Sequence, residues 1–270
     1  MRSKVSGSYG VVVGYDGSPD SCSAMKWAAK EATARGTLLT VCVAGVPDTG
    51  ETESMLRTAQ AAARELAGDR VRSLPLTGSA ARVLCDLSSD ADMVVLGARG
   101  GDRDLMPAVP LGSVSLRVAA HGLGRIVVVR GHWQPVPGMA KRPVVVGADG
   151  SRESLAAMTF AAEEAVLRQS PLIAVCGLAD SAGVLGAAGC IRREFEDQVA
   201  RCKLGNPDLT VRCELSEGPP RQALLEAAAG AQLLVVGARG RGGIDQMTIG
   251  SVGLAALTYA RCPVGVIHAR

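Results

Sequence analysis

The residues best suited to chemistry form a glycine-rich stretch at residues 237–251, with the sequence GARGRGGIDQMTIGS. A largely apolar run at 232–236 precedes it and predicts a strand, and residues 251–260 predict a helix after it. Glycine lets the backbone approach an anion closely, and the free N–H groups at the start of a helix favour negative charge. We therefore expect this stretch to bind an anion such as a phosphate group.

The chain carries a second copy of this arrangement about half its length earlier. Each copy begins with a valine-rich run that ends in an acid, VVVGYDGS at 11–18 and VVVGADGS at 144–151, so the offset is 133 residues. Later segments repeat too, and we match residues 172–176 with 38–42 and residues 232–240 with 92–100. The chain is therefore predicted to be a tandem repeat.

Apolar runs alternate with segments of helical periodicity inside each copy. In the first copy we expect strands at residues 10–14, 38–46, 71–76, 93–96 and 126–129, and helices at 18–35, 53–67, 77–87 and 113–121. This alternation predicts an α/β fold with two open parallel sheets of five strands each and helices on both faces. Ligands bind such sheets at the carboxyl ends of the strands. Each copy places an acid and a glycine loop there.

The composition limits the classes of function. A net charge of +3 without a basic block argues against nucleic acid as the main partner. No stretch approaches the roughly 20 apolar residues of a membrane span, and the first residues, MRSKVSGS, lack the apolar segment of a signal peptide. The eight cysteines show no C-x-x-C spacing and there are only three histidines, so we expect no metal site. Reduced thiols in apolar runs indicate a cytoplasmic chain.

The spacing Gly237-x2-Gly240-x9-Gly250-Ser251 resembles the ATP-binding signature of the universal stress protein family. The valine-rich starts with their acids resemble that family as well, and the resemblance covers nearly the whole chain. It implies two Rossmann-like domains of the adenine nucleotide alpha-hydrolase-like type, at residues 1–132 and 143–270, joined by a linker at 133–142. It also implies that the repeats pair through their fifth strands, and leaves open a homodimer and an unknown protein partner.

The resemblance implies an adenine nucleotide site in each domain, with ATP, with or without Mg²⁺, as the ligand. The aspartates Asp16 and Asp149 would contact the adenine and ribose, and the ends of the second strands, Val43 and Gly177, would read adenine through the backbone. The other implied contacts are the loop residues Gly97, Arg99, Gly100, Gly237, Arg239 and Gly240, and the helix starts Gly112, Ser113, Val114, Ser115, Gly250, Ser251 and Val252. The two arginines could reach a phosphate or point to solvent.

The two copies depart from the family pattern in different ways. Between Gly100 and Gly112 the first copy has eleven residues where the second has nine, and two prolines stiffen this longer loop. In the second copy Gly177 removes a wall of the adenine pocket, and Gly253 replaces the hydroxyl of Ser115. We therefore expect the second site to suit phosphates better and the first to suit adenine better.

Three functions stay open. The first is a nucleotide-binding regulatory module with at most slow ATP hydrolysis, because no nucleophile with a paired base is evident and no catalytic residue is expected. The second is an adenylate-forming enzyme, since residues 16–21 and 149–154 faintly resemble the Ser-Gly-Gly-x-Asp-Ser loop of ATP pyrophosphatases. The third is an interaction protein with empty pockets, which the insertion at 106–111 motivates.

The same residues also have purely structural interpretations. An aspartate before Gly-Ser is a common turn residue at a helix start, and Ser113 and Ser251 are capable N-caps whatever they bind. The RGRGG run at 239–243 could suggest an RNA-binding segment, but its place between a strand and a helix favours a phosphate loop. The chain has no Gly-Lys-Ser/Thr motif and no G-x-G-x-x-G after a strand, which excludes Walker-type and dinucleotide-binding enzymes.

Overall fold

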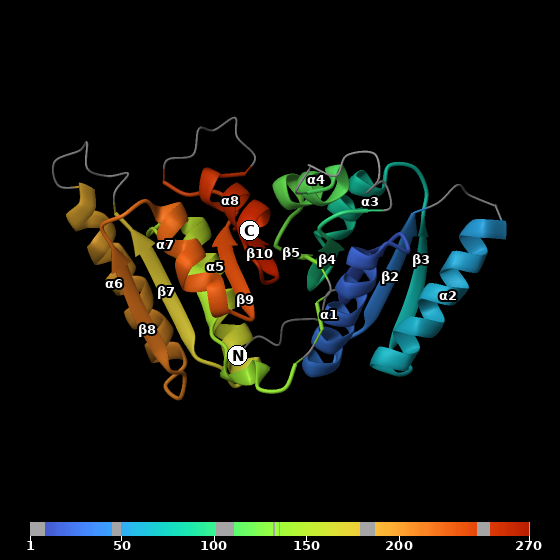
Figure 1. Ribbon diagram of the computed structural model, residues 1–270, viewed down its shortest axis with the longest axis horizontal. Helices are drawn as coiled ribbons and strands as arrows, with labels where there is room; N and C mark the ends of the chain where they lie inside the picture. The colour runs from blue at the N-terminus through green and yellow to red at the C-terminus, as the bar shows by residue number, and fades with distance from the viewer. Residues whose placement is uncertain are drawn as a thin grey trace. The chain divides into compact units, whose positions relative to one another are not determined.

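The chain folds into two units, Met1–Gln134 and Pro135–Arg270. The structure is a computed structural model that describes residues 9–44, 50–100, 111–131, 133–134, 136–178, 187–241 and 249–269. Each unit is a parallel sheet with helices on both faces (Figure 1). This is the α/β fold that the sequence predicts.

The first unit alternates strands and helices along the chain. Its elements are β1 (Val11–Tyr15), α1 (Pro19–Arg35), β2 (Leu39–Ala44), α2 (Gly50–Ala67), β3 (Val71–Leu76), α3 (Ala80–Leu87), β4 (Met93–Gly97), α4 (Ser113–His121) and β5 (Arg125–Val129). The strands pair in parallel in the order β3-β2-β1-β4-β5. Helices α1 and α2 pack together on one face, and α3 packs with α4 on the other. The strand order therefore reverses between β1 and β4, where a ligand is expected.

The second unit repeats this topology. Its elements are β6 (Val144–Gly147), α5 (Arg152–Leu167), β7 (Leu172–Gly177), α6 (Ala187–Gly205), β8 (Val211–Ser216), α7 (Pro220–Ala227), the 3-10 turn η4 (Ala228–Gly230), β9 (Leu233–Gly237), α8 (Ser251–Tyr259) and β10 (Val264–Ile267). The order is β8-β7-β6-β9-β10, with all four pairs parallel. Helices α5 and α6 pack together, as do α7 and α8. Before β6, the predicted linker contains the short 3-10 helix η2 (Met139–Lys141).

The core of each unit lies on both faces of its sheet. The valines at 11–13 and 144–146 are fully buried, as strands covered on both faces require. Alanines on α1 and α5 let these helices approach the sheet closely, and few aromatic side chains are needed. The apolar runs of the sequence are therefore the central strands that position the site.

Serine caps start the first helix of each unit. The Ser18 hydroxyl accepts the Ser21 N–H at 3.2 Å, and Pro19 takes the first helical position, as the sequence predicts. Ser151 accepts the Ser154 N–H at 3.1 Å in the same way. The third helix differs from the sequence prediction, because α3 begins at residue 80 rather than 77.

The register of the sheets corrects the sequence match between the second strands. Val11 pairs with Leu39 in the first unit, and Val144 pairs with Leu172 in the second. Leu172 therefore takes the place of Leu39 and not of Leu38, with the same offset of 133 residues as the first strands. In sequence the other alignment is the better one, because it also matches Val41-Cys42 with Val175-Cys176.

Within the part of the chain that the structure describes, no helix combines the length and the apolar character that crossing a membrane requires.

Candidate functional site

An aspartate and a glycine loop meet at the carboxyl edge of each sheet. A Cβ placed on Gly100 would lie 2.6 Å from Asp16 Oδ2, and one placed on Gly240 would lie 2.5 Å from Asp149 Oδ2. The loop after β4 therefore touches the loop after β1, and the loop after β9 touches the loop after β6. A side chain at either glycine position would have to displace the aspartate carboxylate.

Each aspartate holds its own turn. Asp16 Oδ1 accepts the Ser18 N–H at 3.0 Å, and Asp149 Oδ1 accepts the Ser151 N–H at 3.0 Å. In the second unit Asp149 Oδ2 also accepts the Arg241 N–H at 3.0 Å, so this carboxylate ties the β6 turn to the glycine loop. Asp16 is exposed, whereas Asp149 is half-buried. Both aspartates therefore act as turn residues at a helix start, as the purely structural interpretation of the sequence expects.

A second contact joins each glycine loop to the first turn of a helix. In the first unit a Cβ on Gly97 would lie 2.6 Å from the Asp20 carbonyl carbon, and Asp20 Oδ2 accepts the Arg99 N–H at 3.1 Å. In the second unit the Arg239 guanidinium pairs with Glu153 at 3.3 Å, and a Cβ on Gly237 would lie 2.9 Å from Glu153 Cβ. Arg239 therefore has an acidic partner from α5, which no sequence motif indicates.

The fourth helix of each unit begins with free N–H groups. Gly112 and Gly250 are the N-caps, so the two serines that follow them are the first helical residues rather than caps as the sequence suggested. The Gly250 N–H donates to Ala238 O at 2.8 Å, which fixes the helix start against the loop. Among the described residues no acceptor faces the N–H groups of Ser251, Val252 and Gly253. Together with the helix dipole these groups favour an anion.

The Ser115 hydroxyl is engaged inside the protein. Its Oγ donates to Gly97 O at 2.6 Å, and the side chain is 5% exposed. It holds α4 to the end of β4 rather than pointing to a ligand. Gly253 at the matching position cannot form this internal bond, so the copies differ in how the fourth helix is held to the sheet.

The adenine side of the second pocket also differs from expectation. The register makes Cys176 the counterpart of Val43, and Gly177 the counterpart of Ala44. A Cβ on Gly177 would lie 2.5 Å from Pro220 Cα, so α7 fills the space where the sequence predicted a missing wall. Burial, and then the charge of Asp149, raise the pKa of the Cys176 thiol to about 11, which keeps it neutral.

Comparison with known proteins decides the family. A family model described as the universal stress protein family matches residues 10–130 and again residues 141–268. The chain belongs to the universal stress protein family. The two matches show two universal stress protein repeats, as the resemblance implied.

Related universal stress proteins align along almost their whole length. The universal stress protein Rv2005c of Mycobacterium tuberculosis H37Rv is 34% identical, over 95% of this chain and 96% of the relative. One from Mycolicibacterium smegmatis is 32% identical, over 97% of this chain and 98% of its own. The crystal structure of a universal stress protein from Archaeoglobus fulgidus has a TM-score of 0.73 and 17% identity, covering 97% and 98% of the two chains. This last likeness supports the fold.

An ion pair covers part of the edge in the second repeat of this universal stress protein. Glu194 of α6 pairs with the Arg241 side chain, and both lie directly against Gly150. The first repeat has Gly101 at the position of Arg241, so it lacks this arginine. Sequence reasoning missed the pair, because Glu194 lies 47 positions before its partner and belongs to no motif.

Some expected features fall outside the described residues. These are the stretches 101–110 and 242–248, which include most of the insertion at 106–111. Within the described residues, no group of three or more histidine, cysteine or acidic side chains is arranged to hold a metal ion.

Proposed function

We propose that this universal stress protein binds an adenine nucleotide, with ATP as the preferred ligand, and acts as a regulatory module. The observation that carries this proposal is the meeting of three elements at one edge of the second unit. Asp149 after β6, the glycine loop after β9 and the start of α8 are tied together by the Arg241 N–H and Gly250 N–H bonds. The same elements meet in the first unit through Asp16 and Gly100.

Backbone groups are the proposed phosphate contacts. The unsatisfied N–H groups at the start of α8 and the exposed Ser251 hydroxyl lie beside the loop, and the helix adds about half a positive charge. Arg239 and Arg241 each have an acidic partner, so they add little net charge. The donors present therefore fit a phosphate group without a lysine. Mg²⁺ fits as part of a magnesium–ATP complex, because it prefers phosphate oxygens and water.

The aspartates are the proposed contacts to adenosine. A carboxylate has about four acceptor positions, so the bonds that Asp149 accepts from the backbone leave capacity for a ribose hydroxyl or an adenine amino group. Asp16 is the more exposed acid, and Val43 lies in β2 beside it. The first site is therefore proposed to admit adenosine more easily, and the second to hold phosphates.

Binding rather than turnover is the proposed activity. The Ser18 and Ser21 hydroxyls bond within the first turn of α1, and Ser151 and Ser154 do the same in α5. These hydroxyls are thus committed to capping, which counts against an adenylate-forming loop. We propose no catalytic residue and at most slow hydrolysis of ATP. All eight cysteines are free thiols, and together with an ATP ligand this supports a cytoplasmic location.

A specific observation favours a second candidate function. The Glu194–Arg241 pair lies on Gly150, next to the acid that would contact the nucleotide. A pocket held closed in this way would suit an interaction protein of the same fold that binds no nucleotide.

One experiment separates the two candidates. The freshly purified protein is denatured, the released nucleotides are identified by chromatography, and the emptied protein is titrated calorimetrically with ATP, ADP and GTP. We expect co-purified adenine nucleotide and ATP affinity at least about tenfold above GTP affinity, which corresponds to about 1.4 kcal/mol. Absence of both bound nucleotide and binding heat would leave the interaction protein as the better account.

A further inference from the structure

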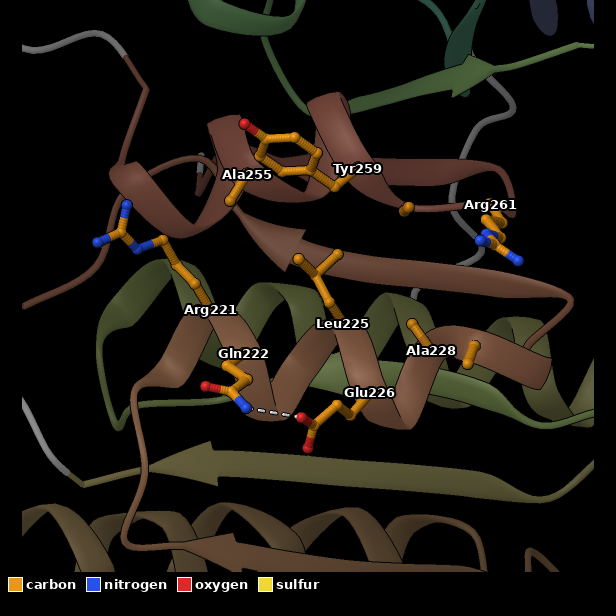
Figure 2. A pocket seen from close by; sticks show the side chains of 10 residues that line it. Arg221, Gln222, Leu225, Glu226, Ala228, Ala255, Tyr259 and Arg261 are labelled. Carbon is orange, nitrogen blue, oxygen red and sulfur yellow. Dashed lines mark hydrogen bonds between the residues drawn. The ribbon is translucent and has the colours of Figure 1, made fainter.

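The second unit contains a groove that lies outside the nucleotide site. It has a volume of about 670 Å³ and runs between α7, η4 and α8 (Figure 2). Leu225 points up from α7 into it, and Tyr259 borders it from α8. Its floor is made of small or apolar side chains, and its ends are basic: Leu225, Ala228 and Ala255 form the floor, and Arg221 and Arg261 form the ends.

The two arginines at the ends of the groove carry uncompensated charge. Within the described part of the chain, neither Arg221 nor Arg261 forms an ion pair or hydrogen bond. Glu226, the acid on α7, also lines the groove; it accepts a bond from Gln222 at 2.8 Å, and both side chains point away from Leu225 in Figure 2. The groove therefore combines an apolar middle with a positive charge at each end.

The first unit provides an internal comparison. Ala255 is the fifth residue of α8, and the fifth residue of α4 is Arg117. Leu225 is the sixth residue of α7, and the sixth residue of α3 is Cys85. Burial, and then the charge of Asp86, raise the pKa of the Cys85 thiol, and the charge of Arg117 lowers it. The first unit thus has a long side chain at the helix position where the second unit has an alanine.

The basic ends are also particular to the second unit. Arg221 stands where the first unit has Ala81, and Arg261 stands where it has Leu123. Tyr259 replaces His121 and is 69% exposed. Tyrosine and arginine beside an apolar depression are the residue types that most often anchor protein partners.

We propose that this groove docks a short segment of a partner protein, in which an apolar anchor side chain is flanked by carboxylates. The anchor packs on Leu225 and Ala255 beside the Tyr259 ring, which removes apolar surface from water. The flanking carboxylates pair with Arg221 and Arg261, whose planar guanidinium groups suit two-point contact. A groove of this volume fits one or two side chains of a segment rather than a whole protein face.

Peptide selection on the full-length protein tests this proposal. A display library of short random peptides is selected against the wild type and counter-selected against Ala255→Arg, which restores the side chain of the first unit. We expect enriched peptides to carry an apolar residue between acidic ones. Their affinity for the wild type, measured by fluorescence anisotropy, should be at least about tenfold higher than for Ala255→Arg.

Charge reversal keeps the test decisive if Ala255→Arg does not fold. Arg221→Glu and Arg261→Glu should each weaken the selected peptides by about threefold or more, whereas Arg193→Glu on the exposed face of α6 should not. Peptides that lack acidic residues, or that bind all variants equally, would overturn the proposal. So would a small dicarboxylic acid, suberate, that binds the wild type and not Ala255→Arg while no peptide is enriched.

Discussion

The Asp149 carboxylate occupies the space that a side chain at residue 240 would need. A Cβ on Gly240 would lie 2.5 Å from Asp149 Oδ2, and the same oxygen accepts the Arg241 N–H at 3.0 Å. Asp16 and Gly100 repeat the relationship at 2.6 Å. The acid and the glycine of this motif therefore depend on each other even before a ligand is considered.

Gly240→Ala should destabilise the second unit only while the acid is present. We expect it to lower the free energy of unfolding by about 1–3 kcal/mol in the wild type, because the new methyl group collides with the carboxylate. In an Asp149→Ala background the same change should cost clearly less. Urea unfolding of the four proteins measures this coupling.

Gly189→Ala on α6 is the matched control, because a Cβ there meets nothing within 4 Å. It should not destabilise the protein. Equal costs in both backgrounds would refute the contact.

Glu194→Gln should open the second site. The substitution weakens the pair with Arg241 and removes a negative charge next to Gly150, so ATP affinity at this site should rise about two- to fivefold. Calorimetric titration checks the change. Glu196→Gln, two residues further along α6 and exposed, should leave the affinity as it is. A weaker affinity in Glu194→Gln would mean that the pair supports the ligand instead of covering the site.

A buried ion pair should contribute more to the free energy of unfolding than an exposed pair with the same i,i+4 spacing. Glu164 on α5 is fully buried and pairs with Arg168, and Glu31 and Arg35 repeat this arrangement on α1. Arg168→Ala should cost about 3–5 kcal/mol, because it leaves a buried carboxylate without its cation. Arg57→Ala breaks a pair whose side chains are 73% and 67% exposed, and should cost less than about 1 kcal/mol. Chemical denaturation of the two variants measures the loss in free energy of unfolding. Similar losses would contradict the view that burial makes the Glu164–Arg168 pair more important.

The buried thiols should resist alkylation. Burial raises the pKa of Cys42 to about 12 and that of Cys262 to about 11, so these thiols stay neutral near pH 8. Exposed Cys190 and Cys213 should react with iodoacetamide first, as mass spectrometry of the folded protein can show. Because the folded pKa values lie above the ordinary thiol value of 9.0, the folded state should also lose stability as the pH rises above 9. A free energy of unfolding that does not change between pH 9 and 11 would contradict the raised pKa values of these thiols.

Local signals made most of the fold predictable from the sequence. Ser18-Pro19 fixes a helix start through a cap and a preset φ angle, and the helices end where the pattern ends, as at Gly36. The second strands were aligned one residue out, because the Val-Cys pairs at 41–42 and 175–176 favour an offset that the sheet register does not have.

The sequence predicts the location of the candidate site at the carboxyl edge of the sheet, but it does not predict the side-chain contacts there. Strand ends place Asp149 and Gly240 together, since parallel strands end at one edge. Which hydroxyls and charges find internal partners depends on tertiary packing. The Ser115 bond to Gly97 O and the Glu194–Arg241 pair therefore had no sequence signal.

Counting the ATP molecules bound by matched variants tests the central proposal most directly. Calorimetric titration would compare the wild type with Asp149→Ala plus Gly240→Ala, in which the new methyl group at residue 240 meets no carboxylate, so the fold should persist. This double variant should lose most high-affinity ATP binding while its circular dichroism is unchanged. Unchanged stoichiometry and affinity in the folded double variant would contradict the assignment of the second site.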